Sequence, residues 1–328
     1  MPSLRPLHGG TDSLPDPRYD FSSNANPLGP CPTVLAALRN TDFTRYPDPQ
    51  YTHLRDALAC HHGTTPDRVV VGAGASELIC RLIRCIDGKV LQLAPTFSEY
   101  ALGARLAGRS LVSAHSPAAF LHAQATHPGI GFICWPNNPT GELWPVDFVA
   151  AAAAAGPVVV DMAYSALCGP DHAAAIDAAA KRAYRLYSPN KTFGLTGVRG
   201  AYVIAPRLQR RLAIAAPSWV IGRDAVTFLE AAIQPEALQW LAQGLPELNR
   251  WRNRLADSLS QIGVPVRESP ATFLLAQVGD AARVAAHLRS RDLRVRDAGS
   301  FGLRQWIRLS AQPPAAQKAL IAALESVL

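Results

Sequence analysis

The sequence lacks any long apolar run, and no stretch approaches the ~18 apolar residues that a membrane-spanning helix needs. The N-terminal stretch has no basic start followed by an apolar segment, because Asp12 and Asp16 interrupt it. Charged residues are few, at 17%, and the six cysteines form no C-x-x-C pair and no zinc-like spacing with histidine. We therefore expect a cytoplasmic protein with reduced thiols, no signal peptide, no metal site and no membrane association.

The chain of 328 residues is long enough for about two domains. Hydrophobic residues make up 48% of it, which favours a compact enzyme over a disordered chain. The net charge of +7 is consistent with an anionic partner. Only Arg207, Arg210 and Arg211 approach a basic cluster, so we do not expect nucleic acid, whereas a small phosphorylated molecule fits well.

From residue 68 onward, short β-branched runs alternate with helical stretches. This alternation is typical of a parallel sheet that is covered by helices on both faces. We expect strands at 69–71, 90–93, 110–113, 130–134, 158–160, 184–187 and 201–204. The predicted fold class is therefore α/β, with one seven-stranded, mostly parallel sheet between layers of helices.

After residue 225 the pattern changes. Two longer helical stretches follow at 226–241 and 245–262, with a break expected at Pro235. Short strand candidates lie at 272–278 and 305–309. We therefore predict three parts: an extended, proline-rich N-terminal arm at 1–40, a large domain at 41–225 and a smaller α+β domain at 226–328.

Ligands of open parallel sheets bind beyond the carboxyl ends of the strands, so the residues that follow each strand are site candidates. Gly74, Ala75 and Ser76 follow the first strand, where a glycine turn and the free amides of a helix start suit a phosphate. The second strand leads to Phe97, whose ring could stack on a planar ligand. Asn138 follows the fourth strand between two prolines. Taken alone, each of these also fits an ordinary turn or core position.

The fifth and sixth strands lead to ionisable residues. Asp161 directly follows three valines, so we expect a part-buried carboxylate that needs a cationic partner, and Tyr164 follows closely. The sixth strand leads to Ser188 and Lys191, with no other basic residue before Arg199. A lysine at the ligand-binding edge of a sheet can act as a nucleophile through Schiff-base formation.

These positions, in this order, resemble the fold-type I family of pyridoxal-phosphate enzymes, in its class I/II aminotransferase branch, over nearly the whole chain. The resemblance makes Lys191, Asp161 and Tyr164 the catalytic residues. It implies that Lys191 holds pyridoxal 5'-phosphate covalently and that Asp161 pairs with the pyridinium nitrogen. Tyr164 and Asn138 would hydrogen-bond the ring's phenolic oxygen, and Phe97 would stack on the ring.

The same resemblance indicates which residues would bind the phosphate of the cofactor. It would lie at the turn of Gly74, on the amides of Ala75 and Ser76, with a hydroxyl from Ser188 and a cation from Arg199.

Two further residues match family positions. Arg308, within Trp-Ile-Arg-Leu-Ser, matches the position that clamps a substrate carboxylate. Tyr46, within Arg-Tyr-Pro-Asp, would reach the cofactor phosphate of the neighbouring subunit. The resemblance therefore implies a homodimer with shared sites.

Two branches of the family compete for the reaction. His8-Gly9-Gly10 and the segment 20–29 resemble threonine-phosphate decarboxylases of cobalamin (vitamin B12) biosynthesis. We therefore expect a lyase that decarboxylates L-threonine O-3-phosphate to (R)-1-amino-2-propanol O-2-phosphate. The alternative is a histidinol-phosphate aminotransferase, which transfers an amino group to 2-oxoglutarate. In either branch we expect His8, Asn24 and Arg308 to bind the small phosphorylated substrate.

Overall fold

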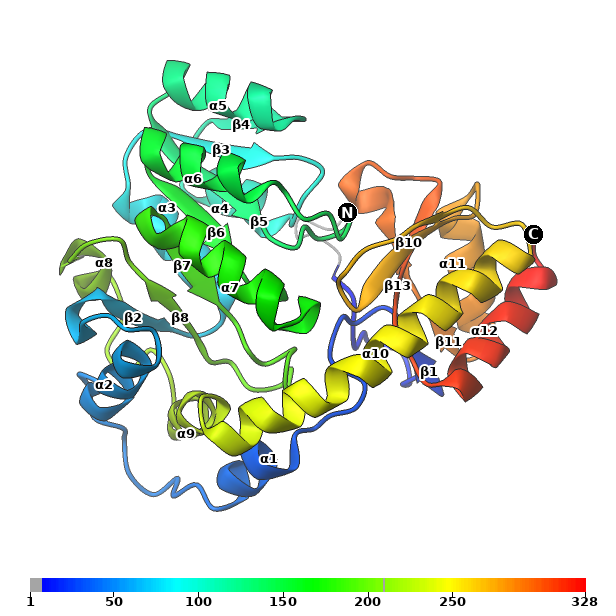
Figure 1. Ribbon diagram of the computed structural model, residues 1–328, viewed down its shortest axis with the longest axis horizontal. Helices are drawn as coiled ribbons and strands as arrows, with labels where there is room; N and C mark the ends of the chain where they lie inside the picture. Colours follow the sequence, from blue (N-terminus) through cyan, green and yellow to red (C-terminus); the bar gives the residue numbers. More distant parts are fainter. Residues whose placement is uncertain (1–7, 209) are drawn as a thin grey trace.

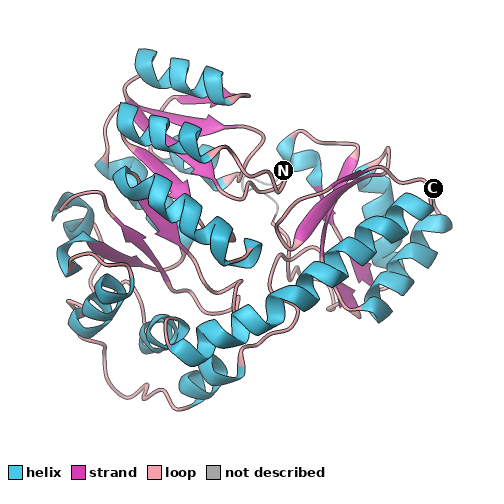
Figure 2. Ribbon diagram, viewed as in Figure 1, coloured by secondary structure: helices cyan, strands magenta, loops and turns pink. Residues whose placement is uncertain are grey.

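The computed structural model describes residues 8–208 and 210–328 of the chain. Its larger part is built on one seven-stranded sheet with helices on both sides (Figures 1 and 2). The strands are β2 (Val69–Gly72), β3 (Lys89–Leu93), β4 (Leu111–Ala114), β5 (Gly129–Cys134), β6 (Val158–Asp161), β7 (Tyr184–Tyr187) and β8 (Ala201–Ile204). All seven predicted strands are confirmed, and so is the predicted fold class.

The strand order in this sheet is β2-β8-β7-β6-β5-β3-β4. Neighbouring strands from β7 to β4 are parallel, whereas β8 runs antiparallel to both β2 and β7. The carboxyl ends of β3, β5, β6 and β7 therefore meet at one edge. The loops that leave this edge are those that carry the predicted catalytic residues.

Helices cover the two faces of the sheet because its side chains alternate between them. Along β6, Val159 packs into one core cluster, whereas Val158 and Val160 pack into the other. The first cluster lies under α3 (Ala75–Cys85), α4 (Glu99–Leu106) and α8 (Arg210–Ile214). The second lies under α5 (Pro117–Thr126), α6 (Val146–Ala155) and α7 (Pro170–Ala179). Short 3-10 helices occur at Pro66–Arg68, Ser165–Cys168, Ala180–Arg182 and Ala298–Phe301.

A smaller part is built on a four-stranded antiparallel sheet. Its strands, in spatial order, are β12 (Arg296–Asp297), β13 (Trp306–Ser310), β10 (Phe273–Gln277) and β9 (Val266–Arg267). Beside it, β1 (Tyr19–Asp20) pairs in parallel with β11 (Leu293–Arg294), and α11 (Ala281–Ser290) and α12 (Pro314–Glu325) complete the packing. The N-terminal segment is thereby tied to the smaller part.

One long helix, α10 (Pro235–Gln261), runs from the larger part to the smaller one (yellow in Figure 1). The predicted break at Pro235 is confirmed, because α9 (Arg223–Ala232) ends before it and α10 begins there. The prediction that a separate helix starts near residue 245 is wrong. Pro246 lies inside α10, where buried leucines on both sides of it keep one face of the helix packed.

The N-terminal segment and the predicted domain boundary need correction. Residues Pro32–Arg39 form α1 rather than extended chain, because Pro32 starts the helix and Val34 is buried in the core. α2 (Thr52–His61) follows. The core also does not change at residue 225: Leu248 still packs with the larger part, whereas Leu255 packs with the smaller one. The rest of the three-part division stays a proposal.

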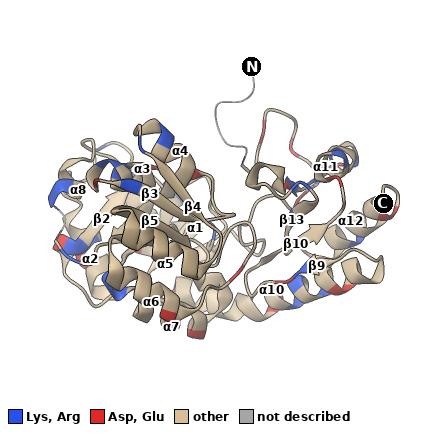
Figure 3. Cartoon of the chain, turned by 90° about the horizontal axis from the view of Figure 1, so that it is seen from above, with Lys and Arg blue, Asp and Glu red and all other residues tan. Residues whose placement is uncertain are grey.

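Within the described ranges, no helix has the length and apolarity needed to cross a bilayer. Lys and Arg residues are distributed over both parts of the chain (Figure 3).

Candidate active site

A cavity of about 370 Å³ lies where the loops of the large sheet meet the N-terminal segment and the small sheet. It brings together most of the residues that the sequence predicts. The predicted site residues that line it are His8, Asn24, Ala75, Ser76, Phe97, Asn138, Asp161, Tyr164, Ser188, Lys191, Arg199 and Arg308.

Asp161 lies at the end of β6 with only 3% of its surface exposed. It accepts a hydrogen bond from Tyr100 Oη at 2.8 Å and one from the Ala163 amide at 3.2 Å. Burial raises the pKa of Asp161, while the Tyr100 hydroxyl and the nearby Lys191 lower it. A buried carboxylate with this surrounding is suited to bind a protonated nitrogen. The contact between Tyr100 and Asp161 joins residues 61 positions apart, and no motif in the sequence predicts it.

Lys191 lies in the loop after β7, and its side chain lines the cavity. Its Nζ atom lies 4.6 Å from the centre of the Tyr164 ring. The Asn26 amide donates to the Lys191 carbonyl at 2.8 Å, which fixes the lysine backbone to the N-terminal segment. The lysine amine and the Tyr164 ring are therefore adjacent in the cavity.

The start of α3 forms a cradle for an anion. Ala75 and Ser76 begin the helix and line the cavity, and the backbone amides at the start of a helix, together with the helix dipole, favour an anion. Gly74 precedes them at φ +91° and does not itself line the cavity, but a Cβ atom there would overlap the Arg199 guanidinium. Ser188 is buried and also lines the cavity. Residues that offer backbone amides, a hydroxyl and a cation therefore line the same cavity.

Arg308 lies on β13 and lines the same cavity, with 4% of its surface exposed. Its Nη2 atom donates to the Ser22 carbonyl at 2.6 Å, and its Nη1 atom donates to Asn138 Oδ1. Burial lowers the pKa of Arg308. Its Nε atom is buried and has no hydrogen-bond partner among the described residues. The guanidinium therefore keeps donor capacity for a ligand.

Arg296 also lines the cavity, and the sequence analysis missed it. It stands opposite Arg308 in the register of β12 and β13. It donates to the Asp297 carbonyl at 2.7 Å and to Ser300 Oγ at 2.6 Å. Burial and the neighbouring Arg308 lower the pKa of Arg296 to about 10. Only the pairing of these strands reveals that the two cations share a site.

The N-terminal segment closes one side of the cavity. His8 Nε2 lies 2.9 Å from Glu99 Oε1, and the His8 ring lies 5.9 Å from the Phe97 ring. Asn24 is 2% exposed, and neither its Nδ2 nor its Oδ1 atom has a hydrogen-bond partner among the described residues. Because an unsatisfied buried amide costs roughly 1–3 kcal/mol, Asn24 is positioned for a polar ligand.

Tyr46 is another predicted site residue that does not line the cavity. Its side chain is 76% exposed and stacks on Trp219 with ring centres 4.7 Å apart. Its predicted contact is with the cofactor of a neighbouring subunit, so this role stays a prediction.

The chain belongs to the family of class I and II aminotransferases, whose sequence model matches residues 17–325. A curated histidinol-phosphate aminotransferase of Ruegeria pomeroyi is 31% identical over 93% of this chain and 90% of the relative. The fold is also similar to that of a histidinol-phosphate aminotransferase of Sinorhizobium meliloti in complex with pyridoxal-5'-phosphate. That structure has a TM-score of 0.81 and 24% identity, and the match covers 95% of this chain and 91% of that one.

The expectation of a threonine-phosphate decarboxylase is contradicted. Curated relatives that match more than nine-tenths of this chain at 30–33% identity are histidinol-phosphate aminotransferases. A threonine-phosphate decarboxylase of Porphyromonas gingivalis shares the fold, with a TM-score of 0.80, 22% identity and coverage of 93% and 98% of the two chains. Because both kinds of enzyme share this fold, the fold does not distinguish decarboxylation from amino transfer. The expectation rested on the N-terminal arm, whereas both reactions use the same catalytic residues.

Family membership confirms the predicted cofactor, pyridoxal 5'-phosphate, and the residues present fit it. Asp161 offers a buried carboxylate for the pyridinium nitrogen, and Lys191 offers the amine. The cradle at the start of α3 has backbone amides and the Arg199 cation for the phosphate. The chain is thus a pyridoxal-phosphate-dependent enzyme of the aminotransferase type.

Proposed function

We propose that this enzyme transfers the amino group of histidinol phosphate to 2-oxoglutarate. One observation carries the proposal: two buried guanidinium groups, those of Arg296 and Arg308, line the same cavity as Lys191. The amino donor carries a phosphate, and the acceptor carries two carboxylates. Two cations in one cavity are suited to bind first the phosphate of the amino donor and then the carboxylates of the acceptor. The curated relatives support this choice of substrates.

The residues around the cofactor would have different roles in amino transfer. Bound pyridoxal phosphate supplies an electron sink for the bonds at the substrate's α-carbon. Asp161 would keep the pyridinium nitrogen protonated, Tyr164 and Asn138 would donate to the phenolic oxygen, and Phe97 would pack on the ring. Lys191 would hold the cofactor and, once released as a free amine, would move the proton at the α-carbon.

Binding of the cofactor phosphate and of the substrate involves other residues. We assign the cofactor phosphate to Ala75, Ser76 and Arg199, beside Gly74 and Ser188. We assign the substrate anions to four other residues that line the cavity, which are His8, Asn24, Arg296 and Arg308.

We also propose that the enzyme works as a homodimer in which Tyr46 reaches the cofactor phosphate of the partner subunit. The exposure of Tyr46 and of Trp219, on which it stacks, supports this arrangement, since exposed aromatic side chains are suited to contact with a second copy.

The test is amino transfer by the purified protein loaded with pyridoxal phosphate. Histidinol phosphate and 2-oxoglutarate are supplied together, and L-glutamate is measured. We expect glutamate to form only with both substrates, and Lys191→Ala to abolish it. Histidinol without its phosphate should be a much poorer donor. Absence of glutamate, or release of carbon dioxide from L-threonine phosphate without any oxo acid, would show that the proposal is wrong.

A further inference from the structure

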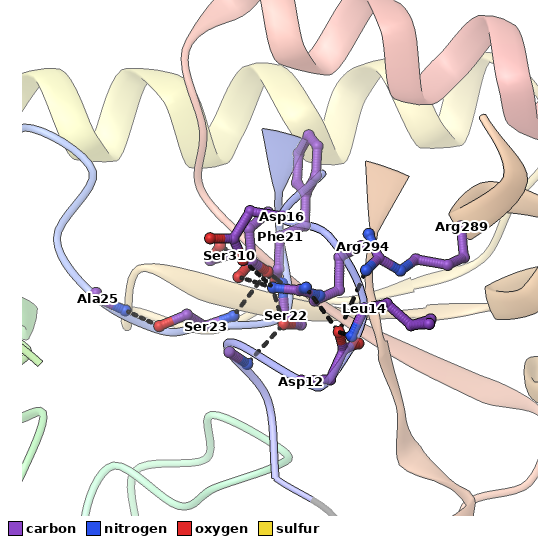
Figure 4. A network of polar contacts seen from close by, with 12 residues as sticks. Asp12, Leu14, Asp16, Phe21, Ser22, Ser23, Ala25, Arg289, Arg294 and Ser310 are labelled. Carbon is purple, nitrogen blue, oxygen red and sulfur yellow. Dashed lines mark hydrogen bonds and ion pairs between the residues drawn. The ribbon is translucent and has the colours of Figure 1, made fainter. Parts of the chain in front are cut away.

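An ion-pair network centred on one buried arginine lies in the smaller part of the chain, and its residues are not among those that line the cavity. Its centre is Arg294 on β11, which is 6% exposed. The Arg294 guanidinium lies 3.1 Å from Asp12, 3.6 Å from Asp16 and 3.4 Å from Asp20. Arg289 adds a second ion pair to Asp12 at 3.2 Å. Figure 4 shows Arg294 and Arg289 pointing toward the N-terminal segment that carries these carboxylates.

Asp20 connects this network to Ser22. Its Oδ2 atom faces Arg294, while its Oδ1 atom accepts hydrogen bonds from the Ser22 amide at 2.7 Å and from Ser22 Oγ at 2.6 Å. The backbone is fixed at the same place, because the Phe21 amide donates to the Arg294 carbonyl at 2.7 Å. Both the main chain and the side chain of Ser22 are therefore held by a carboxylate that Arg294 holds in turn.

Ser22 then contacts two parts of the substrate site. Its carbonyl accepts the hydrogen bond from Arg308 Nη2 at 2.6 Å. Its hydroxyl accepts one from the Gly10 amide at 2.8 Å, and a Cβ atom at Gly9 would overlap the Ser22 carbonyl. Ser22 therefore orients the Arg308 guanidinium and positions Gly9 and Gly10.

We propose that Arg294 and Asp20 are positioning residues for substrate binding, which act through Ser22 on Arg308. The inference rests on the proposed function only in taking Arg308 as the group that binds a substrate anion. This positioning role requires an arginine at position 294. One planar guanidinium donates to Asp12 and Asp20 together, whereas the ammonium group of a lysine is a single point charge.

The test measures binding rather than turnover. Maleate, a dicarboxylate without an amino group, is titrated into the protein loaded with pyridoxal phosphate, and its dissociation constant is measured by calorimetry. We expect Asp20→Asn and Arg294→Lys each to weaken maleate binding by about tenfold, as for the loss of one charge-assisted contact. The affinity for pyridoxal phosphate should stay within about twofold. Arg291→Gln, at an exposed arginine three residues before Arg294, is the matched control and should change neither affinity.

A double-variant cycle separates positioning from a general structural effect. If Asp20 acts through Arg308, Asp20→Asn should weaken maleate binding little further once Arg308 is changed to Lys. An equal loss with and without Arg308 would overturn the proposal, as would unchanged maleate binding by Asp20→Asn. Should these variants fold poorly, Ser22→Ala leaves the ion pairs and the carbonyl in place and removes only the hydroxyl. It should still weaken maleate binding severalfold, and unchanged binding would count against the proposal.

Failure of the proposed function is a separate outcome. A wild-type protein that forms no glutamate from histidinol phosphate, yet shows the coupled loss of maleate binding, would refute the substrate assignment and leave the positioning role intact.

Discussion

Arg296 and Arg308 stand opposite each other on the antiparallel strands β12 and β13, and both line the cavity. Each has 5% or less of its surface exposed. Two buried like charges repel each other, and each lost its hydration when the chain folded. An anion that binds between them relieves both costs, which explains why this end of the cavity should prefer phosphate and carboxylate groups.

Removal of one of these cations should weaken substrate binding without loss of fold stability. We expect Arg296→Gln to raise the KM for histidinol phosphate and 2-oxoglutarate by roughly 10- to 100-fold, because a hydrogen bond to a charged group contributes about 1.5–3 kcal/mol. The Tm should not fall, since the repulsion with Arg308 disappears. Steady-state kinetics and thermal unfolding measure the two effects, with the exposed Arg304→Gln as control. An unchanged KM would exclude Arg296 from the substrate site.

Asp161 should oppose folding in the apoprotein while it supports catalysis. Burial raises its pKa above the ordinary value of 3.8. At pH values between 3.8 and the raised pKa, the folded apoprotein therefore binds more protons than the unfolded chain. The free energy of unfolding should therefore fall as the pH rises from about 3.8 through the raised pKa. Asp161→Asn should remove this fall and lower kcat by about 10²-fold or more, because an amide does not keep the pyridinium nitrogen protonated. Denaturant unfolding of the apoprotein at several pH values checks the first effect.

His62 should make the protein sensitive to acid. Burial, more than the nearby His61 and Arg185, lowers the pKa of His62 to about 3 from 6.5. Its Nε2 atom lies 2.9 Å from the Tyr202 hydroxyl. The stabilisation is complete above pH 6.5 and is lost as the pH falls toward 3, by about 1.4 kcal/mol per pH unit. In His62→Gln this slope should be smaller, whereas the exposed His122→Gln should retain it. Equal slopes in all three proteins would contradict the assignment.

Mixed dimers test whether Tyr46 acts on the partner's site. Lys191→Ala and Tyr46→Ala chains are mixed, and the mixed dimers are isolated by two affinity tags. If Tyr46 acts across the interface, one of the two sites in each mixed dimer has both native residues. We expect the mixed dimer to show about half of the wild-type activity.

The control for this experiment is each variant as a homodimer. The Lys191→Ala dimer should be inactive, and the Tyr46→Ala dimer should bind pyridoxal phosphate more weakly. A mixed dimer no more active than the Tyr46→Ala dimer would place Tyr46 in its own subunit's site or outside any site.

The large sheet and the residues that follow its strands could be predicted from the sequence, because short apolar runs end there in turn residues. Asp161 and Lys191 are such residues, and both line the cavity. Arg296 could not be found in this way, because it reaches the site only through the register of a two-residue strand. The contact of Tyr100 with Asp161 likewise joins residues that are distant in the chain.

Other errors have local causes. The prolines near the N-terminus suggested extended chain, although a proline in the first helical turn is compatible with α1. His8, Gly9 and Gly10 predict the wrong reaction, because relatives that match almost the whole chain are histidinol-phosphate aminotransferases. The residues expected at the α-carbon are common to decarboxylation and amino transfer.

Amino transfer at Lys191 should proceed in two half-reactions, and a single-turnover experiment observes each of them separately. Histidinol phosphate alone is added to the protein loaded with pyridoxal phosphate, and the visible absorbance of the cofactor is followed. We predict that the absorbance is lost without any oxo acid and returns on addition of 2-oxoglutarate, with one glutamate formed per site. Absorbance that histidinol phosphate leaves unchanged would contradict the account.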